Sequence, residues 1–121
     1  MSMPNSGDIQ KITYILDYCK LIEECFIRFG KSFDFFESDA IYRAAVCMCQ
    51  LHIGEISIHL SDKFKEQYKL EIPWEQIRGL RHVLAHNYYS IKAQMIWDIS
   101  TIDVPELRKF CEDILSENQN P

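Results

Sequence analysis

The chain has 121 residues, of which 47% are hydrophobic and 26% are charged. These values are typical of one globular domain rather than of a disordered chain, and no window holds the ~20 apolar residues that a membrane span needs. The formal net charge of −5 argues against non-specific nucleic-acid binding, because phosphate contacts need Lys and Arg, so any such contact must come from a local basic patch.

The N-terminal part predicts a tail and a long helix. Residues 1–7 are expected to form a flexible tail that lacks the regions of a signal peptide, which predicts a cytoplasmic protein without membrane contact. Asp8 is a candidate helix cap, and apolar residues then recur at three- and four-residue steps up to Gly30, a favoured helix stop. The aromatic segment 32–37 is expected to tuck a turn against the core or to contact a second subunit.

A second long helix is expected from Ser38 or Asp39 to about Leu60. Gly54 lies in its middle, where glycine costs about 1 kcal/mol relative to alanine. A close approach of another helix would explain why the sequence accepts that cost.

The C-terminal half predicts a short helix over 63–68 and further helices over 73–87, 91–99 and 104–116, the last of them capped by Asp103. No stretch shows the alternation of a strand. The sequence therefore predicts an all-α, antiparallel bundle of four or five helices in one domain, residues 8–116, followed by a polar tail, residues 117–121.

Several residues with reactive side chains fit packing roles. His52 and His59 lie seven residues apart on the second predicted helix and are expected to be half-buried. The cysteines are odd in number and lie within apolar patterns, so we expect reduced, buried thiols: Cys19, Cys25, Cys47, Cys49 and Cys111.

The stretch from Arg78 to Tyr89 gathers two arginines, two histidines and two tyrosines. Arginine offers a planar fork of donors for phosphate oxygens, and histidine exchanges a proton near neutral pH. A metal-independent cleavage of RNA needs both, because a base must take the ribose 2′-OH proton and a cation must stabilise charge on the phosphoryl oxygens. The other interpretation is that these groups are solvated and favoured by a helix dipole.

Helix geometry limits how this stretch could act. Arg81 and His86 would lie about 140° apart around an ideal helix, whereas His82 and His86 would share a face. Either the helix ends or distorts near His86, or two copies of the stretch meet across a dimer.

The pattern Arg81-x4-His86-x-Tyr88 resembles the Arg-x4-His-x-Tyr motif of HepT-like toxins, which are HEPN (higher eukaryotes and prokaryotes nucleotide-binding) domains. The resemblance covers about residues 8–116. Three further segments fall where that family has similar residues: Gly54-Glu55, Ile72-Pro73-Trp74 and Ile96-Trp97.

The resemblance implies an all-α, HEPN-like homodimer with its active site in the inter-subunit cleft. It implies an endoribonuclease toxin of a HepT/MntA-type toxin–antitoxin system, with RNA and by analogy tRNA as substrate. It assigns phosphate stabilisation to Arg81 and general acid/base catalysis to His86. The cognate nucleotidyltransferase antitoxin would neutralise the toxin by transferring AMP to Tyr88.

Neighbouring residues have supporting roles in this interpretation. Glu55 is either a solvated charge or, as we expect, the ion-pair partner that orients a motif arginine. Arg78 either widens the phosphate patch or pairs with Glu75. His82 stands where the family often has Asn, so whether it assists catalysis or only lines the groove is left open, and Tyr89 is expected to be a core or interface aromatic.

We expect no metal and no cofactor. His82 and His86 have the spacing of a metal-binding pair, but the sequence offers no evident third ligand. Two other functions remain possible from the residues: a non-catalytic adaptor that binds a nucleotide or the nucleotidyltransferase, and a structural helical dimer with an incidental motif.

Overall fold

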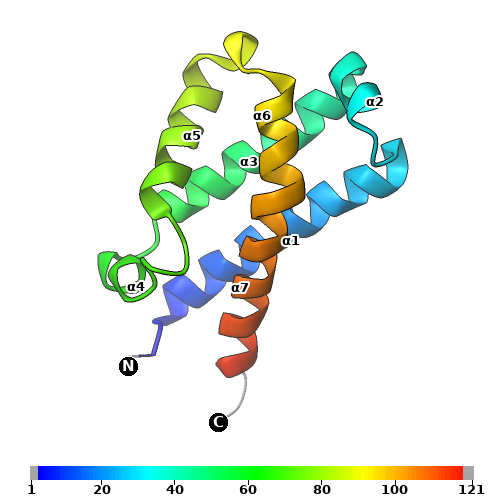
Figure 1. Cartoon of the computed structure of the whole chain (residues 1–121). Helices are drawn as coiled ribbons and strands as arrows, with labels where there is room; N and C mark the ends of the chain where they lie inside the picture. The colour runs from blue at the N-terminus through cyan, green and yellow to red at the C-terminus, as the bar shows by residue number, and fades with distance from the viewer. Residues whose placement is uncertain (1–2, 119–121) are drawn as a thin grey trace.

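The computed structural model describes residues 3–118, which form helices joined by short connections (Figure 1). The prediction of an all-α bundle is confirmed, and no strand occurs in that range. The predicted tails, residues 1–7 and 117–121, lie partly outside it. The helices are α1 (Ser6–Phe29), α2 (Phe33–Ser38), α3 (Ala40–Ile58), α4 (Asp62–Gln67), α5 (Trp74–His86), α6 (Ala93–Asp98) and α7 (Val104–Glu117).

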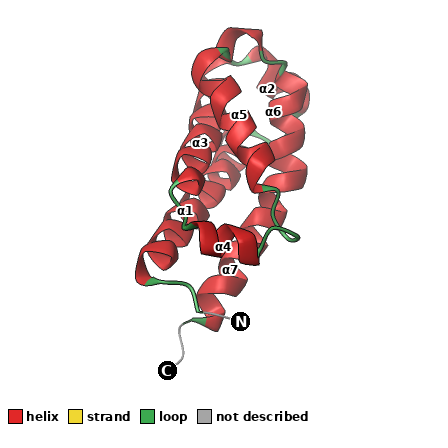
Figure 2. Cartoon of the chain, turned by 90° about the vertical axis from the view of Figure 1, so that its left-hand side faces the viewer, coloured by secondary structure: helices red, strands yellow, loops and turns green. Residues whose placement is uncertain are grey.

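The main core lies between α1, α3 and α7, and α5 packs against α3 and adds Trp74 to this core. Figures 1 and 2 show α4 lying crosswise at the lower end of α5, with α2 at the opposite end of the bundle. The apolar stripe predicted for the first helix is buried as expected, through Ile12, Leu16, Cys19 and Ile22. These contacts make α1 and α3 the frame on which α5 is held.

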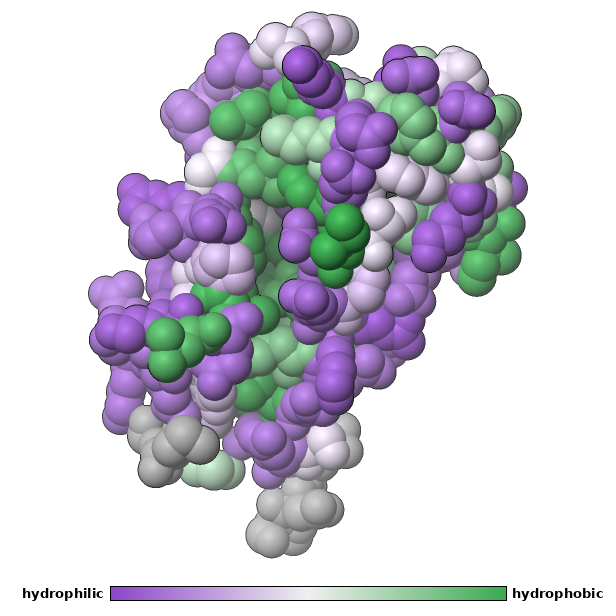
Figure 3. Space-filling model, viewed as in Figure 1, coloured by the Kyte–Doolittle hydropathy of each residue, from purple (hydrophilic) through white to green (hydrophobic). Residues whose placement is uncertain are grey.

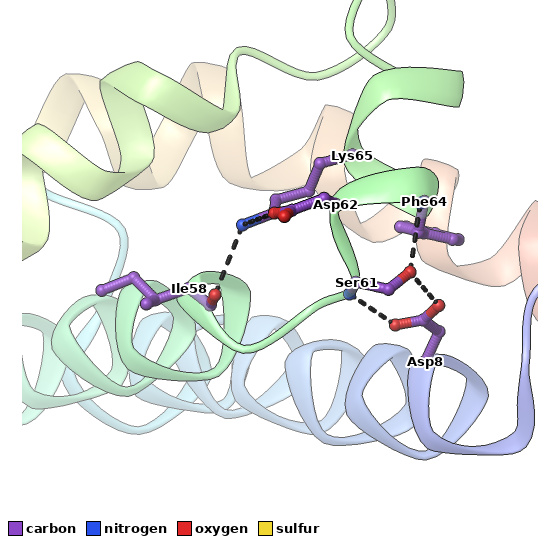
Figure 4. A network of polar contacts seen from close by, with 6 residues as sticks. All are labelled: Asp8, Ile58, Ser61, Asp62, Phe64 and Lys65. Atoms are coloured by element: carbon purple, nitrogen blue, oxygen red, sulfur yellow. Dashed lines mark hydrogen bonds and ion pairs between the residues drawn. The ribbon is translucent and has the colours of Figure 1, made fainter.

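Asp8 does not cap α1, contrary to the prediction. The helix begins at Ser6, and the side chain of Asn5 accepts the capping hydrogen bond from the Asp8 backbone N–H at 2.7 Å. Asp8 is buried, and its carboxylate accepts hydrogen bonds from the backbone N–H and hydroxyl of Ser61 at 2.8 and 2.7 Å (Figure 4). The Ser61 oxygen in turn accepts from the Phe64 N–H, so Asp8 anchors the start of α4 to α1.

Asp103 does not start a separate helix either. A π turn, Ile99–Asp103, joins α6 to α7, with the Val104 N–H bonded to the Ile99 carbonyl, and Figure 1 shows one continuous helical rod. Pro105 lacks an N–H and cannot continue a regular helix, but here it falls in the first turn of α7, where that N–H is not needed. The π turn therefore takes the place of the predicted connection between two separate helices.

The aromatic segment after α1 forms a short helix, α2, rather than a simple turn. Phe36 is fully buried in a second core cluster, where its ring packs against Tyr42 and Trp97. Phe35 is exposed. The same cluster buries Leu84, which fixes the C-terminal half of α5.

All five cysteines are free thiols, as expected; three are buried, and Cys25 and Cys47 are half-buried. Burial raises the pKa of Cys19 to about 12. His52 is half-buried and stacks on Tyr18, whereas His59 is exposed, so the packing prediction is wrong for His59. None of the helices in residues 3–118 is long and apolar enough to cross a membrane.

Candidate functional site

The crossing of α3 and α5 is closest at Gly54. A Cβ atom added to Gly54 would lie 2.5 Å from the Cβ and 3.4 Å from the Cα of Arg81. Real side chains do not tolerate such a contact, so only glycine lets the two helices meet there. The predicted close approach is confirmed, and it places the base of the Arg81 side chain directly against α3.

Arg81 pairs with Glu55, as predicted. Its Nε–H donates to the Glu55 Oε1 at 2.5 Å, and the arginine side chain is 30% exposed. Guanidinium carries five N–H donors, of which this bond uses one. The two terminal amino groups of Arg81 donate no hydrogen bond within residues 3–118. They can therefore bind a phosphate, while Glu55 fixes the direction of the guanidinium.

His82 and His86 are both exposed on the outer face of α5, with ring centroids 4.6 Å apart. The helix continues to His86, and Asn87 is its C-terminal cap. No hydrogen bond or ion pair joins Arg81 to His86 in the described part of the chain. Because α5 is helical from Arg81 to His86, the two motif residues start about 140° apart around its axis within one chain.

Tyr88 folds back onto α3 through a 3-10 turn, Tyr88–Ser90. Its hydroxyl lies near the Cys47 thiol, and the two groups influence each other's pKa. Burial raises the pKa of Tyr88, the Cys47 thiol adds to the rise, and Arg43 opposes it. The hydroxyl is therefore neutral at physiological pH.

Tyr89 is fully exposed, with its ring edge-on to that of Tyr88. The core placement that was one of its predicted alternatives is wrong. An interface role stays a prediction, because no residue within 3–118 covers this ring.

A first hollow, of about 220 Å³, lies between α5 and the rod formed by α6, the π turn and α7. We call it the apolar hollow; Figure 3 shows its apolar floor between polar rims. Gln50 lines it and is only 3% exposed; its Nε2 donates to the Ile96 carbonyl and the Ser100 hydroxyl, while its Oε1 accepts no hydrogen bond within the described residues. The acidic residues of its lining are Glu71, Asp103 and Glu106.

A second hollow, also of about 220 Å³, lies where α3, α4 and the first turns of α5 meet. We call it the basic hollow, because Lys65 and Arg78 outnumber the single acid, Glu75. No ion pair joins Arg78 to Glu75 in residues 3–118, so the predicted alternative of a surface pair is wrong. The complete lining is Ser57, Ile58, Lys65, Trp74, Glu75 and Arg78.

Sequence reasoning did not predict the basic hollow. Lys65 lies on α4, before the turn that leads into α5, and no periodicity within a helix connects it to Arg78. Trp74 was noted only as part of a segment that resembles the family. The remaining signal was the local excess of Lys and Arg, which does not show which residues converge.

His82 and His86 lack the partners of a metal site in the described residues, where no group of three or more His, Cys, Asp or Glu side chains gathers in a metal-binding arrangement. The candidate site therefore consists of a paired arginine, two exposed histidines, a half-buried tyrosine and the adjoining basic hollow.

Comparisons with known proteins point to one family. The family model described as "Ribonuclease HepT-like" matches residues 15–114. The chain is 30% identical over 108 residues to "Putative RNase TTE0752" of Caldanaerobacter subterraneus, covering 89% of this chain and 94% of that protein. It is 32% identical over 94 residues to "Probable ribonuclease HepT" of Thermococcus cleftensis, covering 78% and 83%. No solved structure matches it significantly.

Proposed function

The chain belongs to the ribonuclease HepT-like family, and from this premise we propose that it is a metal-independent endoribonuclease that acts as the cytoplasmic toxin of a toxin–antitoxin pair. The observation that carries the proposal is the Arg81–Glu55 pair. Glu55 takes the Nε–H of Arg81 and leaves the terminal amino groups for a phosphate. An arginine held in this way is prepared to stabilise charge on a phosphoryl group.

The proposed reaction uses two side chains. His86 takes the proton from a ribose 2′-OH, and the 2′ oxygen attacks the adjacent phosphorus. The bond from phosphorus to the 5′ oxygen breaks, and that oxygen takes up a proton from the imidazolium. Arg81 stabilises the charge that builds on the non-bridging oxygens, and the products are a 2′,3′-cyclic phosphate end and a 5′-OH end.

We propose that the working form is a homodimer. Arg81 and His86 diverge on one helix, so a complete site needs Arg81 of one copy near His86 of the other. An exposed stripe on α3 supports this arrangement, because Ile41 and Met48 stand two and one heptads before Glu55 and therefore share its face. This stripe is an exposed apolar surface that extends along α3 to the Arg81–Glu55 pair. A second subunit that covered the stripe would also lie beside that pair.

The partner in this proposal is a nucleotidyltransferase antitoxin that transfers AMP to Tyr88. Burial raises the pKa of the Tyr88 hydroxyl, so the antitoxin would have to remove its proton during transfer. The attached adenylate adds bulk and negative charge beside α5. It would exclude an RNA phosphate by steric overlap and like-charge repulsion.

The test is cleavage of single-stranded RNA and tRNA by the purified chain in the presence of EDTA. His86→Ala should lower the rate about 100-fold or more, because the proton transfer is lost. The matched control is His59→Ala, which removes another exposed histidine and should leave the rate within about twofold. Thermal unfolding checks that both variants are folded.

An unchanged rate in His86→Ala would refute the catalytic assignment. If the wild-type chain binds the nucleotidyltransferase tightly, cleaves no RNA and does not inhibit growth when expressed alone, the protein is instead a non-catalytic adaptor. Toxicity that depends on both Arg81 and His86 would exclude that alternative.

A further inference from the structure

We propose that the basic hollow is an anion subsite that holds a second phosphate of the RNA strand, beside the phosphate bound by Arg81. The residues that form it are Lys65, Trp74 and Arg78. Its role in RNA binding rests on the proposed ribonuclease function, whereas its capacity to bind a phosphate can be tested separately.

Trp74 supplies the first argument. Its side chain is only 7% exposed and packs against Phe64 and Phe110, yet its indole N–H has no hydrogen-bond partner in the described part of the chain. An indole nitrogen can only donate, and a buried donor without an acceptor is unfavourable. Trp74 lines the hollow with another part of its side chain, because the indole nitrogen itself is buried, so an oxyanion would meet this donor only after a small local shift.

Lys65 and Arg78 supply the charge. Figure 4 shows the Lys65 side chain reaching from α4 towards the end of α3, where its ammonium donates to the Ile58 carbonyl at 3.3 Å. Its nearest carboxylate oxygen, on Asp62, is 3.9 Å away. An ammonium has three N–H donors, so Lys65 keeps capacity for a ligand. Arg78 forms no ion pair within residues 3–118.

The surroundings hold these groups in place. Asp8 and Ser61 anchor the start of α4 to α1, which positions Lys65 against the end of α3. Glu75 opposes an anion, but the two cations outnumber it, and the hollow lies at the N-terminal, positive end of the α5 dipole. The sum of these groups favours a negatively charged ligand.

The position along α5 suggests which anion binds. Arg78 precedes Arg81 by three residues, so the two lie on one face, about 4.5 Å apart along the helix axis. The basic hollow and the Arg81–Glu55 pair therefore follow one another along α5, on the side that packs against α3. A strand lying along this side of α5 would place one phosphate at each, which fits single-stranded RNA better than an isolated nucleotide.

Binding can be observed at Trp74 itself. The chain has two tryptophans, so its ¹⁵N spectrum has two indole N–H signals, which Trp74→Phe assigns. The catalytically disabled His86→Ala variant is titrated with inorganic phosphate and, separately, with a short single-stranded RNA. We expect the Trp74 signal to shift saturably with both, while the Trp97 signal stays in place.

No shift of the Trp74 signal with either ligand would overturn the proposal. A shift with inorganic phosphate alone would overturn the assignment to the RNA strand. The titration involves no cleavage, so it gives its result even if the wild-type chain proves to have no ribonuclease activity and the proposed function fails.

Kinetics test the contribution to RNA binding. The double variant Lys65→Gln/Arg78→Gln should raise KM about tenfold, leave kcat within about twofold, and make the dependence of log affinity on log salt concentration shallower by about 1.4, or about 0.7 for each lost phosphate contact. The control is Lys63→Gln, which removes an exposed cation from the same helix without touching the hollow. A fall in kcat with unchanged KM, or an equal rise of KM in the control, would overturn the subsite.

Discussion

The apolar hollow and the basic hollow border different sides of α5 and have the same volume, about 220 Å³, yet their chemistry is opposite. The lining of each includes one residue with a buried polar atom that has no partner in the described residues: Gln50, whose amide oxygen is an acceptor, in the apolar hollow, and Trp74, whose indole N–H is a donor, in the basic one. Acidic residues line the first, and two cations line the second. The volume therefore says little about what either hollow can bind. The negative charges that line the apolar hollow disfavour a phosphate there, whereas the positive charges that line the basic hollow favour one.

The largest effect should come from disturbing the helix crossing that separates these environments. Gly54→Ala should lower the free energy of unfolding by about 2 kcal/mol, because the contact with the Arg81 Cβ outweighs the gain in helix propensity. Gly79→Ala on the exposed face of α5, where an added Cβ meets nothing within 4 Å, should raise it by up to about 1 kcal/mol. Urea denaturation measures both, and a gain in both variants would contradict the close crossing.

A smaller change in stability is expected for a variant of the apolar hollow, with no change in RNA affinity. Gln50→Leu removes two buried hydrogen bonds, to the Ile96 carbonyl and the Ser100 hydroxyl, but also removes the unpaired oxygen, so we expect a net loss of about 1 kcal/mol of stability. Its affinity for RNA should not change. Gln94→Leu, on the exposed face of α6, serves as the control and should change stability by less than about 0.5 kcal/mol. Weaker RNA binding by Gln50→Leu would show that the two hollows are not independent.

The smallest effect should come from the acids. Glu75→Gln removes the one negative charge of the basic hollow and should tighten RNA binding about twofold, or about 0.4 kcal/mol. Glu106→Gln, on the lining of the apolar hollow, should leave the affinity unchanged. Fluorescence anisotropy with a labelled single-stranded RNA measures both, and the difference should vanish near 1 M salt, where the Debye length is about 3 Å. An equal gain of RNA affinity in both variants would mean that the affinity depends only on the net charge of the protein and not on the basic hollow.

The part of the site that lies on single helices, or where two helices cross, followed from the sequence. Gly54 in a long apolar helix predicted a close neighbour, and Glu55 beside it predicted the ion pair with Arg81; both are observed. The divergence of Arg81 and His86 followed from the angle between residues on a helix. These inferences succeeded because spacing determines which side chains share a face.

Contacts between distant segments could not be predicted in the same way. Asp8 was expected to cap its own helix, but it bonds to Ser61, 53 residues later. The basic hollow depends on how the turn between α4 and α5 brings Lys65 beside Trp74. No local spacing rule describes such a turn, because its geometry is decided by the packing of the whole domain.

The π turn between α6 and α7 has a consequence for how the length of this chain can vary. A π turn contains one residue more than the α-helical turn that it replaces. Deletion of one residue from Ile99–Asp103 would therefore convert it to ordinary helix and keep Ile96 and Leu107 on the core side. The same deletion within α3 before Gly54 would rotate Glu55 by about 100° relative to the preceding part of the helix. The C-terminal rod can thus lose a residue during evolution, whereas the length of α3 is fixed by the crossing that holds the arginine.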